Sequence, residues 1–204
     1  MKIRHLAVLA LGLALALPAF AKDKKTAAPP AMTAEQKAAM EAWQKAATPN
    51  EKHQQLIAGF EGTWDTKMTS WMDPSSKPQT ETGKSVNTAV LGGRQLRMEY
   101  TGQFMGQPFE GVGYNGYDNV TGKYFSTWSD NMSTGLMVSH GEYDPASKAY
   151  VYHAQMPDPM QNGALVPIRE VVRVVDADHV NFEMYETRDG KERKSMQIEY
   201  VRAK

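Results

Sequence analysis

The spacing of apolar and polar residues along the chain changes near Phe60. Upstream of it, residues 33–59 are rich in strong helix formers with apolar residues three or four positions apart, which predicts two consecutive helices. Thr33 followed by Gln36 fits a capping box at the start of the first helix. Thr48 fits an N-cap for the second, and we expect this helical pair to cover one mouth or edge of the domain that follows.

From Phe60 onward, apolar and polar residues alternate with a period of two, which predicts β-strands. We identify ten candidate strands, at residues 62–72, 80–90, 94–102, 109–117, 123–130, 135–143, 149–155, 166–176, 179–187 and 192–201. The connections are short, the longest being residues 156–165, and they leave no room for crossover helices. We therefore predict a mainly β fold, a single antiparallel up-and-down barrel of about ten strands with an N-terminal helical pair.

Residues 109–130 show the pattern most clearly. Two strands flank residues 118–122, where Asp, Asn and Gly favour a reversal of the chain. Three glycines, Gly111, Gly113 and Gly116, interrupt the first of these strands. Because glycine inside a strand marks a sharp bend or a close approach by another group, we expect one or the other here.

The N-terminus has the features of a secretory signal. Lys2 and Arg4 precede an apolar run that is too short for a comfortable membrane span, and small residues lead to an expected cleavage after Ala21. Four segments follow from this division: a signal peptide at 1–21, a flexible linker at 22–32, a helical extension at 33–59 and the barrel domain at 60–204. We expect a bacterial periplasmic or secreted protein whose mature chain has no membrane span.

Composition and motifs exclude several classes of protein. The chain has no Cys, so it has no disulfide and no lipid attachment site. Loss of Lys2 and Arg4 leaves the 23 acidic residues slightly in excess, which argues against nucleic acid as a partner. The dinucleotide fingerprint, the phosphate-binding loop, the nucleophile elbow and the paired-histidine metal motifs are all missing, so we predict no cofactor and no metal, and an enzyme is the less favoured reading.

Several aromatic, histidine and arginine residues on the predicted strands are candidates for ligand binding. They are Tyr100, Tyr114, Trp128, His140, Tyr152, His153 and Arg97. Tyrosines with apolar bodies and polar tips, together with methionines on the strands, suit an interior that holds an amphipathic molecule. A plain aromatic core explains the same pattern, and both interpretations stay open.

Two histidines form a second candidate. His140 and His153 fall at similar distances from the turn between their strands, so we expect them to be cross-strand neighbours. With Glu142 two residues beyond His140, they would make a metal or proton-transfer site and thus a barrel enzyme. We prefer the interpretation that both histidines are satisfied by polar neighbours.

The apolar residues of the helical pair suggest a third reading. Met40, Trp43, Leu56 and Ile57 would form a docking face for a partner protein if they were exposed. The sequence itself indicates no particular protein partner.

At the start of the first strand, Phe60-Glu61-Gly62-Thr63-Trp64 resembles the Gly-x-Trp opening of lipocalins and related calycin barrels. In those families an arginine near the end of the last strand packs across the tryptophan, and the resemblance assigns this barrel-closing pair to Trp64 and Arg202.

An ordered set of motifs is similar to the exported bacterial proteins of domain-of-unknown-function family 1579. The set comprises Leu91-Gly92-Gly93-Arg94, Phe109-x-Gly111, Gly116-Tyr117-Asp118-Asn119, Trp128-x-Asp130 and Gly141-x-x-Asp144. The resemblance covers residues 56 to 202 and implies a lipocalin-like barrel, but it implies no reaction. We therefore expect a protein that binds a small apolar or amphipathic molecule inside the barrel, with a partner-docking module or a barrel enzyme as alternatives.

Overall fold

The computed structural model describes residues 31–72 and 77–204, so the predicted signal peptide and most of the predicted linker lie outside the described residues. The helices are α1 (Ala34–Ala47), α2 (Glu51–Phe60) and a short 3-10 helix (Pro159–Gln161). The strands are β1 (Gly62–Ser70), β2 (Gln79–Val90), β3 (Gln95–Phe104), β4 (Gln107–Asp118), β5 (Lys123–Asp130), β6 (Met137–Asp144), β7 (Ala149–Asp158), β8 (Ala164–Val174), β9 (His179–Arg188) and β10 (Lys191–Arg202).

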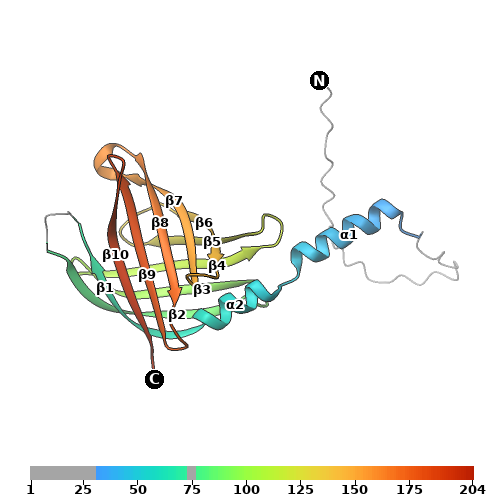
Figure 1. The fold of residues 1–204 in the computed structure, drawn as a ribbon, viewed down its shortest axis with the longest axis horizontal. Helices are drawn as coiled ribbons and strands as arrows, with labels where there is room; N and C mark the ends of the chain where they lie inside the picture. The colour runs from blue at the N-terminus through green and yellow to red at the C-terminus, as the bar shows by residue number, and fades with distance from the viewer. Residues whose placement is uncertain (1–30, 73–76) are drawn as a thin grey trace, which may run out of the picture.

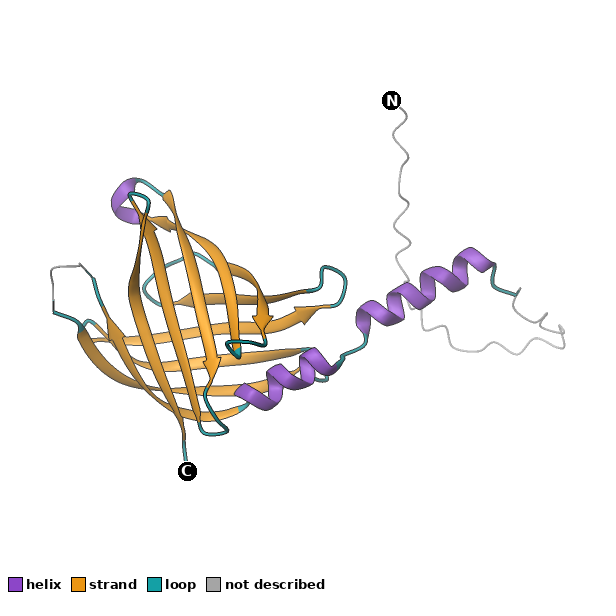
Figure 2. Cartoon of the chain, viewed as in Figure 1, coloured by secondary structure: helices purple, strands orange, loops and turns teal. Residues whose placement is uncertain are grey.

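The ten strands form a closed antiparallel barrel in which each strand pairs with its neighbours in sequence and β1 pairs with β10 (Figures 1 and 2). The predicted fold class is therefore confirmed. Along β1, Trp64, Thr66 and Met68 are buried, while Asp65 and Lys67 between them are exposed. This alternation fixes which side chains point into the barrel, because successive residues of a strand face opposite sides of the wall.

The two long helices begin for reasons that are local in the sequence. The capping box of Thr33 and Gln36 at α1 is present as predicted. The predicted start of α2 at Thr48 is wrong, because the Thr48 hydroxyl donates to the Gln44 carbonyl and so closes α1. The N-cap of α2 is Asn50, whose backbone N–H donates to His53 Nδ1 at 3.1 Å.

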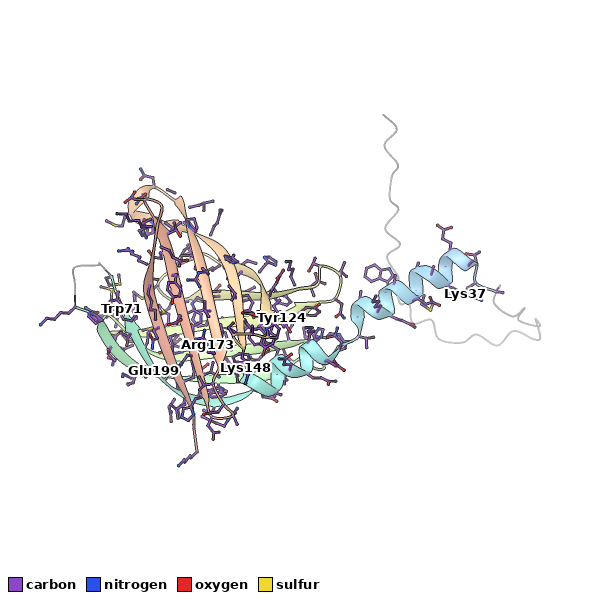
Figure 3. The ribbon with its side chains drawn as sticks, in the orientation of Figure 1. Lys37, Trp71, Tyr124, Lys148, Arg173 and Glu199 are labelled. Atoms are coloured by element: carbon purple, nitrogen blue, oxygen red, sulfur yellow. The ribbon has the colours of Figure 1, made fainter. Side chains whose placement is uncertain are left out.

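Only α2 covers an end of the barrel, which we call the helix end; the opposite end, with the turns at 105–106 and 189–190, is the far end. Helix α2 contacts β3 and β4, while α1 extends away from the barrel and buries none of its residues (Figure 1). In Figure 3, Lys37 on α1 accordingly lies well clear of the strands. Neither long helix among the described residues has the length and apolar character of a membrane span.

The junction between α1 and α2 is held by the turn between β4 and β5. Asn119 Nδ2 donates to the carbonyl oxygens of Lys45, Ala46 and Thr48, at 2.8 to 3.2 Å. Asn119 Oδ1 accepts a hydrogen bond from Asn50 Nδ2 at 2.7 Å. This asparagine therefore satisfies carbonyl groups that the end of α1 leaves without partners inside the helix.

The connection between β7 and β8 is shorter than predicted. β7 runs on to Asp158, and β8 begins at Ala164, so the connection between them is shorter than the predicted residues 156–165. Asp158 is the reason, because its carboxylate caps the 3-10 helix at Met160 N and pairs with Arg188. Two directed contacts thus close the chain into a tight turn.

Candidate functional site

The barrel interior is filled at the helix end. Leu56 of α2 packs there with Tyr124, Tyr150 and Tyr152, all buried, and Figure 3 shows Tyr124 within the strands beside α2. The Tyr124 and Tyr150 rings meet edge to face with centroids 4.9 Å apart. Burial raises the pKa of Tyr124 to about 12, and that of Tyr150 still further. We call this group, with the flanking Phe60, Tyr117, Tyr143, Val172 and Val174, the aromatic plug.

Outside the plug, some inward-facing side chains are buried and others are only half-buried. In a barrel filled by its own side chains, such positions would be removed from solvent. Solvent instead reaches a set of them on six strands, which we call the lumen residues: Met98, Asn115, Ser126, Trp128, Ala154, Phe182, Met184, Met196 and Tyr200. Part of the inner wall therefore stays in contact with solvent.

The glycines of β4 explain part of this space. A Cβ atom at Gly111 would overlap the Trp128 ring, and one at Gly113 would lie 3.1 Å from it, so the indole lies flat on the inner wall. Trp128 Nε1 donates to Asp130 Oδ2 at 2.9 Å, which fixes the ring in this position. On the outer face, Phe125 packs against Gly116. The predicted close approach to these glycines is confirmed.

Tyr100, on the neighbouring strand β3, also packs its ring against glycines. Its ring lies against Gly83 and Gly102, and the Thr66 hydroxyl donates to its phenol oxygen at 3.2 Å. Burial raises the pKa of Tyr100. Two large aromatic side chains thus lie against glycines of the inner wall.

A buried acid faces the lumen from β8. Glu170 is 4% exposed and lies level with Tyr152 on β7 and Met184 on β9. Burial raises the pKa of its carboxyl, and the nearby Ser139 hydroxyl lowers it slightly. Ser139 Oγ is buried and has no hydrogen-bond partner of good geometry among the described residues, so it lies near the carboxyl without a well-formed hydrogen bond to it.

The far end carries an ion network. Arg188 donates to Asp158 Oδ2 at 2.5 Å and to Glu186 Oε2 at 2.8 Å, and Arg193 lies 3.5 Å from the same Glu186 oxygen. Arg188 holds the pKa of Asp158 below its usual range. These opposite charges satisfy one another at the rim of the barrel.

A depression of about 590 Å³ indents the wall between β6 and β7. Pairing between these strands stops at His140 and His153, although β7 continues for five more residues. The depression is lined by Leu136, Val138, His153, Ala154, Gln155, Pro167 and Ile168. It combines outward-facing residues with the inward-facing Ala154 and Ile168.

The structure divides the predicted ligand-binding residues between the two faces. Tyr100, Trp128 and Tyr152 point inward. Tyr114 and Arg97 lie on the outer face, and Arg97 pairs there with Glu99 at 2.6 Å. Tyr114 and Arg97 are therefore not part of the interior site, because the residues next to them in their strands, a glycine of β4 and Met98 of β3, face inward.

The histidine pair is also on the outer face. His140 and His153 are cross-strand partners, as their spacing predicts. Both are exposed, since Ser139 and Tyr152 next to them face inward, and Glu142 pairs with Lys123 on the surface. A proton-transfer site inside the barrel cannot be built from these residues. The described residues also contain no group of three acidic or histidine side chains that would hold a metal ion.

Trp64 and Arg202 stand opposite each other where β1 meets β10. The guanidinium carbon of Arg202 lies 4.1 Å from the centre of the Trp64 ring. Trp64 Nε1 donates to the Phe60 carbonyl at 2.9 Å, and Arg202 Nη1 donates to the Glu61 carbonyl at 2.8 Å. The pair thus joins the first strand, the last strand and the end of α2.

Three residues with clear roles escaped the sequence reasoning: Glu170, Ser139 and Asn119. A signal existed for Glu170, because it shares the two-residue register of the apolar Ile168 and Val172 on the same strand. An acid on the apolar face of a strand is unusual enough to be singled out. The role of Asn119 depends on a contact with a distant helix end, which no local pattern indicates.

Comparison with solved structures finds the same fold. The crystal structure of Rv2717c from M. tuberculosis is 14% identical, covers 76% of this chain and 100% of that chain, and has a TM-score of 0.55. The S-type phycobiliprotein lyase CPES from Guillardia theta is 11% identical, covers 76% of this chain and 99% of that chain, and has a TM-score of 0.51. At these identities the likeness concerns the fold alone.

Comparison with families assigns the chain more directly. No curated protein matches it. A family model described as "Protein of unknown function (DUF1579)" matches residues 48–202, which include α2 and all ten strands. Since this match spans most of the chain, the protein belongs to the DUF1579 family.

Proposed function

We propose that this protein binds a small apolar or amphipathic molecule in the lumen of its barrel, and that it does so in the bacterial periplasm after cleavage near Ala21. One observation carries the proposal: the lumen residues face inward yet stay half-buried. Apolar and aromatic surface that is exposed to water inside a barrel is stabilised when a ligand covers it.

The composition of the lumen favours an amphipathic ligand over a purely apolar one. Met98, Met184 and Met196 are flexible and polarisable, and they adapt to ligands of different shape. Asn115 and Ser126, on the neighbouring strands β4 and β5, add polar groups to the same surface. Such a mixture of apolar area with a few polar groups is typical of small-molecule sites.

The test has two parts. Native mass spectrometry of the protein, extracted without denaturation, measures whether a small molecule copurifies with it. Titration with the dye 1-anilinonaphthalene-8-sulfonate then compares the wild type with Ser126→Phe, which fills the lumen, and with Thr101→Phe, which adds the same ring to the exposed outer face of β3. We expect Ser126→Phe to lose dye binding and Thr101→Phe to retain it. Equal dye binding by all three proteins, without a copurified molecule, would contradict the proposal.

The location has a separate test. In a cell fraction that contains only the periplasm, N-terminal sequencing of the protein should begin at Lys22. Recovery of the uncleaved chain in the cytoplasmic fraction would contradict the periplasmic part of the proposal and leave lumen binding unaffected.

A second candidate function is docking of a partner through α1. Trp43 is 75% exposed, and Met40, three residues earlier on the same helix, is 47% exposed. The docking face proposed from the sequence is reduced to these two residues, because Leu56 is buried in the aromatic plug and Ile57 packs near Gly93. Photo-crosslinking from position 43 in living cells tests this candidate. A discrete crosslinked product supports docking, and its absence contradicts it.

A further inference from the structure

Glu170 is a buried acid without a countercharge. Glu170 is 4% exposed, no ion pair reaches its carboxyl in the described part of the protein, and the Ser139 hydroxyl is the one side-chain hydrogen-bonding group that affects its pKa. The side chains at its level on the neighbouring strands are Tyr152 and Met184, which carry no charge. An unpaired buried carboxyl is costly, so its retention calls for a physical explanation.

The cations that face the interior are engaged elsewhere. Within residues 31–72 and 77–204, Arg188 and Arg193 lie at the far end and pair with Asp158 and Glu186. Arg202, at the helix end, packs over Trp64. Among the described residues, the interior at the level of Glu170 therefore holds one acid and no unpaired cation.

Hydroxyl groups surround this acid. Ser139 is 1% exposed, and its Oγ atom lacks a hydrogen-bond partner among the described residues. This oxygen lies near the Glu170 carboxyl. The phenols of Tyr152 and Tyr200 are near enough for the acid to raise their pKa values further, in addition to the effect of burial. Both phenols are thus neutral, and Glu170 is the acid at this level whose pKa burial raises.

From this geometry we propose that Glu170 and Ser139 bind the protonated amine of an amphipathic ligand, while its apolar part lies against Trp128 and the methionines of the lumen. This inference rests on the proposed lumen binding and adds the chemical class of the ligand. An ammonium group has three donors, and it meets two acceptors here, the carboxylate and the Ser139 oxygen. A carboxylate ligand would instead be repelled by Glu170 and would find no free cation beside it.

The ligand would supply what the protein lacks. A carboxylate and an ammonium that meet out of contact with water attract each other strongly, and each offsets the cost of burying the other. The half-buried side chains of Trp128 and Met184 then cover the chain of the ligand. Recognition thus combines one charge contact with a nonspecific apolar surface, which predicts selectivity for the headgroup and tolerance for the tail.

The test uses three probes with the same tail: n-decylamine, n-decanol and sodium decanoate. Isothermal titration calorimetry at pH 8 measures their affinities for the wild type, for Glu170→Gln and for Glu110→Gln, a matched change at an exposed outer position of β4. In the wild type and in Glu110→Gln we expect decylamine to bind at least about tenfold more tightly than decanol, and decanoate most weakly. Glu170→Gln should lose this preference for the amine while decanol binding stays within about twofold.

Ser139→Ala tests the same site by a second substitution, which remains informative if Glu170→Gln fails to fold. Its decylamine affinity should fall by a few fold, with decanol affinity unchanged. Decylamine binding to the wild type should weaken as the pH is lowered through the raised pKa of Glu170, because protonation removes the charge that the amine pairs with.

The outcomes separate the two proposals. Equal binding of decylamine and decanol by the wild type, or an amine preference that survives in Glu170→Gln and Ser139→Ala, overturns the amine inference and leaves lumen binding intact. Failure of all three probes to bind overturns both.

Discussion

The two halves of the barrel interior use similar residues in opposite ways. At the helix end, Tyr124 and Tyr150 pack against each other and against Leu56, and water is excluded. In the lumen, Trp128 lies flat along the wall over glycine, and its neighbours stay half-buried. The helix end therefore resembles an ordinary protein core, while inward-facing side chains of the lumen stay in contact with solvent.

The difference shows what each half contributes. Buried aromatic contacts in the plug supply the stability that a chain without disulfides must obtain from its core. The lumen gives up part of that stability, because its apolar side chains keep contact with water and Glu170 lacks a partner. A site that is prepared for a ligand commonly has this character, since groups that await a partner cannot satisfy one another.

The largest expected effect comes from truncating one aromatic residue in each half. Tyr150→Ala should lower the free energy of unfolding by about 3–5 kcal/mol, because it removes a fully buried ring from the plug. Phe182→Ala should lower it by less than about 2 kcal/mol, since this inward ring is only half-buried. Urea denaturation followed by circular dichroism measures both values. Equal losses would mean that the lumen is packed as tightly as the plug.

A methyl group on β4 should have the next largest effect. Gly113→Ala places its Cβ against the Thr127 carbonyl oxygen, so the two strands must separate locally, at a cost of about 1–3 kcal/mol. The nearest atoms to a Cβ at Gly111 all belong to the Trp128 ring, a side chain that can shift at the expense of its hydrogen bond to Asp130. We expect Gly111→Ala to lose less stability and to change the tryptophan emission spectrum more. A spectrum that matches the wild type would show that Trp128 does not rest on Gly111.

Glu170→Gln, in contrast to the substitutions above, should raise the free energy of unfolding of the protein. The folded state raises the pKa of Glu170, so it binds a proton more tightly than the unfolded state does. Wild-type stability therefore falls as the pH rises from the ordinary pKa of glutamate through this raised pKa, and the loss is complete above it. At pH 8 the variant should be more stable, by on the order of 1–3 kcal/mol, and the gain should vanish near pH 4. Thermal unfolding of both proteins across this range, with Glu110→Gln as control, measures the gain, and a destabilised variant at pH 8 would indicate a partner for Glu170 inside the protein.

The smallest effects belong to the outer face. His140→Ala and His153→Ala remove exposed side chains, so each should change the free energy of unfolding by no more than about 0.5 kcal/mol. Decylamine binding should stay unchanged in His140→Ala, which is outside the wall depression. A large loss of binding in this variant would place the ligand on the outer face.

The strands and their order could be predicted from the sequence because both depend on local signals. The period of two and the turn residues locate β5 and β9 within a residue at each end. The start of α2 was misplaced, since Thr48 and Asn50 are both good capping residues and only the hydrogen bond of Thr48 to Gln44 decides between them.

The candidate site was harder to predict, because a period of two does not say which face is inside. Hydrophobicity usually settles this question, but here the lumen is partly polar and the outer wall carries Tyr114 and Val138. Tyr114 lies outside because the inward position beside it, Gly113, is occupied by the ring of Trp128 from the next strand. The approach of Glu170 to Ser139 joins strands β8 and β6 and depends on the closed barrel, so it follows from the structure alone.

Entry of a ligand into the lumen can be measured directly at the methionine side chains that line it. With ¹³C-labelled methionine methyl groups, titration with n-decylamine should shift the NMR signals of Met98, Met184 and Met196, which line the lumen. The exposed Met40 and Met160 should keep their positions, since they lie on α1 and in the β7–β8 turn. Shifts confined to exposed methionines, or signals that do not respond at saturating amine, would contradict a ligand-binding lumen.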